Sequence, residues 1–430
     1  MHARLVPSRR PRMFGAVAAG LFAVLLAWSP VLAAVSWGDP HKASTDYAYS
    51  WQQSLTRTVT TAGTAYLHQV FTRDFIGGDV VEDGGPYLGI YYKRGTSTGS
   101  SWSGAVRLNS SSQHGDYGTD AASGKYLYAA WRRELHYGAN YDPEEPRELK
   151  FRRNTNHGHR DYWKPGVSFL GANYIDRPSI SASGATVFIA YTDASGGEIR
   201  LQRSTDNGAS FDLLEAIGAT TLLGSEGYSG EPVVAVSGST VAVIWNDGTS
   251  SQIRISTNGG ADWAPAEEFD DVRYADASAA HRDGRIAFAW TDTSDRHVYA
   301  RVYSGGTLGP IRTIVTLSDG TTYKKAHNPA VALTGTSRIG VAYSACNTTG
   351  CDVGSSKGSS IRWLESGNNG STWTSNTTIG SLATTSSRRI NEYPSALYSS
   401  STRRLVSWTA AGQSSGSNYR VIIRLGLGSP

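Results

Sequence analysis

Arginines, carboxylates and tyrosines recur at the ends of short apolar segments in this sequence. Arg177 precedes Pro-Ser-Ile-Ser, Glu231 precedes Pro-Val-Val-Ala, and Tyr393 precedes Pro-Ser-Ala-Leu. A guanidinium group can bind a carboxylate through two parallel hydrogen bonds, so several such groups around one opening would suit an acidic sugar. The alternative interpretation is that these groups pair with one another as salt bridges between neighbouring elements. Further groups of this kind are Asp74, Asp116, Arg273, Tyr274, His327 and Arg389.

The apolar segments belong to a unit of roughly 50 residues that recurs along the chain. In its clearest copy, four short segments follow one another at Arg177 to Ser181, Thr186 to Tyr191, Glu198 to Arg203 and Leu213 to Ile217. Apolar residues alternate or run together in each, as in strands that are covered on both faces. The unit therefore predicts a four-stranded antiparallel sheet, and its recurrence predicts a ring of such sheets.

Three units carry the same turn between their third and fourth segments, with the spacing Ser-x-Asp/Asn-x-Gly-x-x-Trp/Phe. The hydroxyl and the carboxylate or amide can bind backbone N–H groups, while glycine can take a positive φ and the aromatic ring can pack between sheets. We therefore expect these residues to be structural. They are Ser204, Asp206, Gly208 and Phe211; Ser256, Asn258, Gly260 and Trp263; and Ser366, Asn368, Gly370 and Trp373.

This spacing resembles the Asp-box, or BNR, repeat of sialidases and other secreted β-propellers. The resemblance implies an all-β propeller of four-stranded blades with Asp-box turns, which we expect to fill residues 34–430 as one domain. Counting units favours seven blades, with six, the number in sialidases, as the alternative. The last unit stops after three strands, so a strand between Val35 and Ser50 is expected to complete it and close the ring.

Blade geometry predicts where the chemistry lies. The inner strand of a blade starts, and its second strand ends, at one rim, whereas the turn between the third and fourth strands lies at the opposite rim. The Ser-Asp-Gly turns are therefore expected to be scaffold. A binding or catalytic site is expected around the other mouth of the central channel.

Resemblance to sialidases also implies roles for residues at that mouth. In that family an arginine cluster holds the substrate carboxylate, a tyrosine is the nucleophile, a glutamate is its base and an aspartate is the acid. The resemblance implies Arg177, Arg273 and Arg389 as the cluster, Tyr393 as the nucleophile, Glu231 as its base and Asp74 or Asp116 as the acid, with Tyr274 and His327 as further substrate-binding groups. The family's Arg-Ile-Pro signature is absent from the first inner strand.

Because the scaffold motif is present and this signature is not, we expect a propeller that binds a glycan or another surface ligand at its mouth. A sialidase-like exo-glycosidase acting on acidic glycans is the alternative. A structural or adhesive surface protein is the second alternative, since fold alone does not decide function. No cofactor and no metal site is expected.

The first 33 residues have the pattern of a secretory signal, with four arginines, an apolar run and small residues before Ala33. We expect export after cleavage there, with a retained anchor as the alternative, and no membrane span in the remainder. Without those arginines the 36 basic residues equal the 36 acidic ones, so the charge does not indicate a nucleic-acid partner. We expect a monomer.

Cys346 and Cys351 are the only cysteines and are separated by four residues. In an exported protein this spacing predicts a disulfide that closes a small loop, because a metal site would need further ligands nearby.

Overall fold

The computed structural model describes residues 35–43, 49–74, 88–111, 113–134, 148–169, 175–193, 197–214, 216–219, 231–295, 297–316, 325–346, 359–381, 391–412 and 418–428. The chain divides into two units, Met1–Val31 and Leu32–Pro430, and all the described residues belong to the second. The predicted signal segment lies outside them. Within the described ranges no helix is long and apolar enough to cross a membrane.

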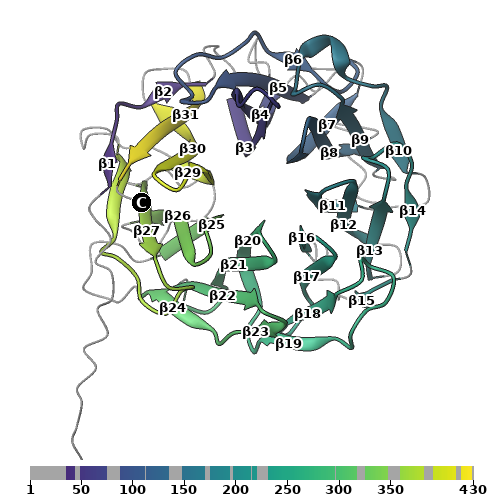
Figure 1. Ribbon diagram of the computed structural model, residues 1–430, viewed down its shortest axis with the longest axis vertical. Helices are drawn as coiled ribbons and strands as arrows, with labels where there is room; N and C mark the ends of the chain where they lie inside the picture. The colour runs from purple at the N-terminus through teal and green to yellow at the C-terminus, as the bar shows by residue number, and fades with distance from the viewer. Residues whose placement is uncertain are drawn as a thin grey trace, which may run out of the picture. The chain divides into compact units, whose positions relative to one another are not determined.

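Seven antiparallel sheets, which we number as blades 1 to 7, are arranged in a ring (Figure 1). This confirms the predicted all-β propeller and its seven blades. Blade 1 contains β3 (Tyr49–Val59), β4 (Ala65–Asp74), β5 (Gly89–Thr96) and β6 (Val106–Arg107). Blade 2 contains β7 (His114–Ser123), β8 (Tyr126–Glu134), β9 (Glu148–Asn154) and β10 (Val167–Phe169). Blade 3 contains β11 (Ile175–Ser183), β12 (Thr186–Asp193), β13 (Glu198–Ser204), β14 (Asp212–Leu213) and β15 (Gly218–Ala219). Blade 4 contains β16 (Val233–Ser237), β17 (Thr240–Asn246), β18 (Ser251–Ser256) and β19 (Glu267–Asp270). Blade 5 contains β20 (Tyr274–Arg282), β21 (Arg285–Asp292), β22 (Val298–Ser304), β23 (Thr307–Leu308) and β24 (Arg312–Val315). Blade 6 contains β25 (Lys325–Thr334), β26 (Arg338–Cys346), β27 (Ser359–Ser366) and β28 (Thr377–Ser381). The one helix in the described ranges is the 3₁₀ turn η1 (Arg160–Tyr162).

Blade 7 joins the two ends of the described chain. Its inner three strands are β29 (Asn391–Ser400), β30 (Arg403–Gly412) and β31 (Asn418–Leu427), and its outer strands are β1 (Ser36–Trp37) and β2 (His41–Lys42). Ser36 pairs with Leu427 and His41 pairs with Ile423. The predicted closure of the ring by a strand between Val35 and Ser50 is therefore confirmed.

Each second strand contributes at least one large aromatic side chain to the core, and one from each strand lies at an equivalent position. These seven are at most 3% exposed, so they fill the space between blades. They are Phe71, Trp131, Tyr191, Trp245, Trp290, Tyr343 and Trp408.

Serine hydroxyls connect the inner strands of successive blades. An inner strand is the edge of its sheet, so half of its N–H groups have no partner within the blade. Ser179, Ser181 and Ser183 of β11 accept hydrogen bonds from the N–H groups of Val234 (3.2 Å), Val236 (3.1 Å) and Gly238 (3.0 Å) of blade 4. Equivalent bonds run from Asp120 to Ser54, from Gly284 to Ser237, from Val331 to Ser278 and from Leu55 to Ser395.

The three Ser-x-Asp/Asn-x-Gly turns share one hydrogen-bond pattern. The Ser204 hydroxyl accepts from Gly208 N–H at 2.8 Å and donates to Asp206 Oδ1 at 2.8 Å. Partial burial opposes ionisation of Asp206, yet hydrogen bonds from Ser210, Ser204 and Ala209 N–H hold its pKa well below the usual range. The same two serine bonds occur at Ser256 and at Ser366.

Backbone hydrogen bonds fix the rim on which these turns lie. Asn207 N–H donates to Ala185 O at 2.8 Å, Gly259 N–H to Ser239 O at 2.7 Å, and Asn369 N–H to Ser337 O at 2.8 Å. Each acceptor lies at the turn between the first and second strands. The three turns therefore lie at the rim opposite to the starts of the inner strands.

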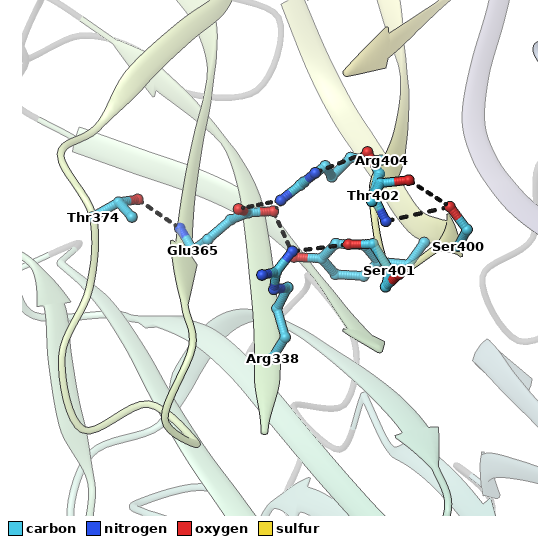
Figure 2. Close-up of polar contacts among 8 residues, drawn as sticks. Arg338, Glu365, Thr374, Ser400, Ser401, Thr402 and Arg404 are labelled. Carbon is cyan, nitrogen blue, oxygen red and sulfur yellow. Dashed lines mark hydrogen bonds and ion pairs between the residues drawn. The ribbon is translucent and has the colours of Figure 1, made fainter. Parts of the chain in front are cut away.

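A buried ion pair connects blades 6 and 7. Figure 2 shows Glu365 of β27 facing Arg404 of β30, with hydrogen bonds to Glu365 Oε1 from Arg404 Nε at 2.5 Å and to Oε2 from Nη2 at 2.8 Å. Both side chains are 1% exposed. Tyr398 donates a third bond to Glu365 Oε1 at 2.6 Å. The pair is fully satisfied, so loss of one partner would leave an uncompensated buried charge.

Glu365→Gln should therefore lower the free energy of unfolding by about 3–5 kcal/mol, because Arg404 stays buried without its counter-charge. The measurement is urea unfolding followed by tryptophan fluorescence, compared with the double variant Glu365→Leu/Arg404→Met. The double variant should lose much less, because it removes both desolvation costs. Wild-type stability in Glu365→Gln would contradict this account.

Candidate functional site

The inner strands bend at one rim through a repeated β-bulge. In five blades two inner-strand residues lie opposite a single aromatic residue of the second strand. The pairs are Gln52-Gln53 opposite Phe71, Tyr117-Gly118 opposite Trp131, Arg177-Pro178 opposite Tyr191, Asn328-Pro329 opposite Tyr343, and Tyr393-Pro394 opposite Trp408. Glu231-Pro232 directly precedes β16 at the same place in blade 4.

In five blades the residue at the start of this bulge, or at the equivalent place before β16, has a positive φ although none of the five is glycine. The values are 50° for Tyr117, 29° for Arg177, 30° for Glu231, 48° for Asn328 and 51° for Tyr393. Such a conformation costs on the order of 1–3 kcal/mol per residue and is concentrated at functional sites. Proline fits the second position because a bulge residue needs no N–H for the ladder. Five strained polar residues at one rim therefore mark a candidate site.

These residues surround the opening of a central cavity of about 670 Å³, which is lined by the inner strands of all seven blades. Each blade contributes one polar residue at the bulge end, and we call this set the mouth ring. Its members are Gln53, Tyr117, Arg177, Glu231, Asp276, Asn328 and Tyr393.

Charged groups of blades 2 to 4 form a continuous, internally paired arc. Arg177 Nη1 lies 2.8 Å from Glu231 Oε1, and the Arg177 guanidinium carbon lies 5.3 Å from the centre of the Tyr117 ring. The guanidinium carbon of Arg132 lies 4.5 Å from the same ring. Arg132 donates two hydrogen bonds to Asp116, at 2.8 and 2.5 Å. Each arginine thus already has a carboxylate partner, and Tyr117 contacts both guanidinium groups.

Asp276 connects the mouth ring to blade 6. Its Oδ2 accepts a hydrogen bond from Asn328 N–H at 3.2 Å and lies 3.9 Å from His327 Nδ1. This carboxylate therefore holds the bulge of Asn328 in place. His327, a predicted substrate-binding residue, lies beside the mouth ring.

Tyr274 and Arg273 are also predicted to bind substrate, and Tyr274 lies in the cavity wall. Tyr274 is 2% exposed, and its hydroxyl donates to the backbone oxygen of Glu231 at 2.5 Å. Burial raises the pKa of Tyr274 well above its usual value, and the Glu231 carboxylate raises it further. Arg273 precedes β20, and its carbonyl accepts from Thr293 N–H at 3.0 Å. Tyr274 thus positions the bulge that carries Glu231.

Other predicted residues fall partly outside the described ranges. The side chain of Asp74, at the end of β4, and all of Arg389 and Cys351 lie outside them. Cys346 is 2% exposed at the end of β26, and its disulfide with Cys351 stays a prediction. In the described ranges no group of three or more His, Cys, Asp or Glu side chains is placed to hold a metal ion.

The structure places Arg177, Glu231 and Tyr393 around one cavity, and their catalytic or binding roles stay predictions. Glu231 pairs with Arg177 of the neighbouring blade, whereas Tyr393 lies three blades away on blade 7. Tyr117 and Asn328 stand at inner-strand entrances in the sequence, but the sequence assigned neither residue a catalytic or binding role. An X-Pro pair at the start of an inner strand would have indicated Asn328, because Arg177, Glu231 and Tyr393 share it. Tyr117 is followed by Gly118 and lacks that signal.

Asp120 lies deeper in the same cavity, between blades 1 and 2. It is 5% exposed and accepts hydrogen bonds from Ser54 and, at 3.0 Å, from Thr56. Burial raises the pKa of Asp120 to about 7, and the two hydroxyl groups oppose that rise. The middle of the channel therefore holds a carboxyl group that changes charge near neutral pH.

Comparison with known proteins supports the fold. No protein-family model and no curated protein matches the chain. A crystal structure of a protein of unknown function from Dyadobacter fermentans is similar, with a TM-score of 0.51 and 12% identity over 92% of this chain and 99% of that one. The Hadza microbial sialidase Hz136 has a TM-score of 0.46 and 13% sequence identity, over 70% of this chain and 66% of the sialidase chain. Trypanosoma rangeli sialidase in complex with the inhibitor DANA has a TM-score of 0.47 and 10% sequence identity. That comparison covers 92% of this chain and 60% of the sialidase chain. At these identities the first similarity shows a shared fold, and the two sialidase comparisons carry no argument about activity.

Asp120→Asn should stabilise the protein above neutral pH and have little effect near pH 4. An unfolded aspartate titrates near 3.9, so the native state binds more protons between about pH 4 and pH 7 and loses stability as the pH rises through that window. The gain at pH 8 should reach up to about 4 kcal/mol, because each tenfold change in an acidity constant is equivalent to about 1.4 kcal/mol. Urea unfolding at pH 4, 6 and 8 measures it.

The exposed variant Asp161→Asn controls for the loss of one carboxyl group. A stability difference between wild type and Asp120→Asn that does not grow from pH 4 to pH 8 would show that Asp120 is not held as a buried acid.

Proposed function

We propose that the mouth ring binds a carbohydrate and that this chain acts as a carbohydrate-binding propeller. The observation that carries the proposal is the set of five strained polar residues, one from each of five blades, which line the same cavity. Residues held at a positive φ cluster at ligand sites, where the surrounding structure keeps a backbone conformation that a relaxed strand would not adopt. The cavity volume of about 670 Å³ also lies in the range of small-ligand sites.

The chemistry of the mouth ring suits sugar hydroxyl groups. A hydroxyl can donate to the Glu231 carboxylate and accept from Arg177 without separating that pair. Tyr117 and Tyr393 offer aromatic faces with a polar end, and Asn328 offers both a donor and an acceptor. Neutral hydroxyls therefore fit this arc better than a substrate carboxylate, which would have to displace Glu231 or Asp116.

The sialidase-like alternative is not favoured by the described part of the mouth. Arg177, implied as part of the clamp, pairs with Glu231, which is implied as the base of Tyr393. The Glu231 carboxylate is therefore engaged with an arginine, whereas the base of a nucleophile must lie within hydrogen-bond reach of that nucleophile. The second alternative, a structural role, would explain the salt bridges but gives no reason for the strained bulges.

The setting of this site follows from two further interpretations. We interpret the three Ser-x-Asp/Asn-x-Gly turns as Asp boxes, on their shared serine hydrogen bonds. We infer export from the signal-like N-terminal segment. An exported propeller would meet glycans at cell surfaces, so its partner would be a surface glycan and not a nucleic acid.

The test uses a glycan array, followed by calorimetry with the oligosaccharide that binds best. Asn328→Gly removes one mouth-ring side chain at a position where φ is 48°, so the backbone should keep its conformation. Affinity should fall by about tenfold or more, since a lost hydrogen bond and its unsatisfied partner cost about 1–3 kcal/mol.

Asn207→Gly is the matched control. It makes the same change at a φ of 59°, but on the opposite rim, and should leave affinity unchanged. Absence of any glycan binding, or equal affinity of both variants, would contradict the proposal. Turnover of a fluorogenic sialoside that Tyr393→Phe abolishes would instead establish the hydrolase.

A further inference from the structure

The channel carries a different set of charges at its other end, where the inner strands finish. Arg57 of β3 and Arg282 of β20 line the cavity there, although blades 1 and 5 are not neighbours in the ring. His281 lines the same part of the wall. The remaining wall near these strand ends includes the apolar side chains of Leu333 and Leu397.

Arg57 carries a half-buried guanidinium group that lacks a protein partner among the described residues. Its Nε atom is buried, and within the described ranges no group accepts a hydrogen bond from it. Arg57 and Arg282 line the same cavity; burial lowers the pKa of Arg57, and the positive charge of Arg282 lowers it further. A half-buried charge without a protein partner has lost part of its hydration, so a counter-ion beside it would be favourable.

The surroundings of Arg57 contain little that could neutralise it. Arg282 Nε lies 3.2 Å from Asp283 Oδ2, but that carboxylate is 68% exposed and Arg282 itself is 45% exposed. Burial lowers the pKa of His281 to about 4, so its ring is neutral at pH 7 and can donate one N–H. This end of the channel therefore presents two guanidinium groups, of which only Arg282 has a carboxylate neighbour, together with one neutral donor and apolar walls.

We infer that this end of the channel binds a small oxyanion, such as phosphate, sulfate or the carboxylate of a small metabolite, between the guanidinium groups of Arg57 and Arg282. Guanidinium groups bind such anions through paired, charge-assisted hydrogen bonds, and the apolar walls strengthen the attraction by excluding water. The anion would offset the repulsion between the two arginines and so hold blades 1 and 5 together across the channel. The site is separate from the mouth ring and does not depend on what the mouth ring binds.

Inorganic phosphate is a suitable probe. Calorimetry and thermal unfolding of the purified protein at pH 7.5 would be followed as phosphate is added, with sodium chloride used to keep the ionic strength constant. Wild type should show saturable binding and a melting temperature that rises with phosphate concentration. Arg57→Gln should weaken phosphate binding about tenfold or more, because it removes a charge-assisted contact.

Two controls separate a specific site from general charge effects. Arg312→Gln removes the same charge from an exposed position on β24 and should bind phosphate as wild type does. Arg57→Gln without phosphate should be at least as stable as wild type, because it removes the repulsion from Arg282. If Arg57→Gln fails to fold, the more exposed Arg282→Gln supplies the same comparison.

Phosphate affinity that is equal in wild type, Arg57→Gln and Arg282→Gln would overturn the inference, as would the absence of saturable binding to wild type. The mouth-ring variant Asn328→Gly should bind phosphate normally. Failure of glycan binding therefore leaves this result intact, and failure of phosphate binding leaves the mouth ring intact.

Discussion

The hydrogen bonds from inner-strand N–H groups to serine hydroxyls of the preceding blade are the interaction on which the rest of this structure depends. A propeller places seven sheet edges around one channel, and each edge carries N–H groups that the blade itself cannot satisfy. Ser179, Ser181 and Ser183 satisfy three of them on blade 4, and single serines do so at other blade junctions. Because each bond joins two blades, the position of one inner strand fixes the position of the next, and the channel wall is rigid enough to hold a site.

The two ends of the channel differ because the inner strands carry different side chains where they start and where they end. At one end the strands bulge opposite a buried aromatic, and the bulge turns Arg177, Glu231 and Tyr393 toward a common opening. There the charges are paired, so the surface suits neutral hydroxyl groups. At the other end Arg57 and Arg282 both line the cavity, and only Arg282 has a carboxylate neighbour, the exposed Asp283, so we infer a surface that suits an anion. A single ring of strands thus presents two chemically distinct ends.

The sequence predicted the architecture well because its signals are local. The turn spacing around Ser204 repeats, the apolar segments recur at a regular interval, and the missing strand of the last unit pointed to the residues near Ser36 that close the ring. The site was harder to predict, because its pairs come from different blades. Nothing local shows that Arg177 meets Glu231, that the Tyr274 hydroxyl binds the Glu231 backbone, or that Arg57 and Arg282 line the same cavity. These contacts depend on the curvature of the whole ring.

Site-resolved amide hydrogen exchange, measured for wild type and Ser181→Ala, tests most directly whether hydroxyl bonds between blades fix the inner strands. The account predicts slow exchange at Val236 N–H in the wild type, although this group lies on a sheet edge, because Ser181 accepts its hydrogen bond. Ser181→Ala should speed exchange at Val236 about fivefold or more, since a hydrogen bond contributes about 1 kcal/mol, and should change the Val331 amide of blade 6 much less. Exchange at Val236 in the wild type as fast as in an unfolded peptide, or no change on removing the hydroxyl, would contradict the account.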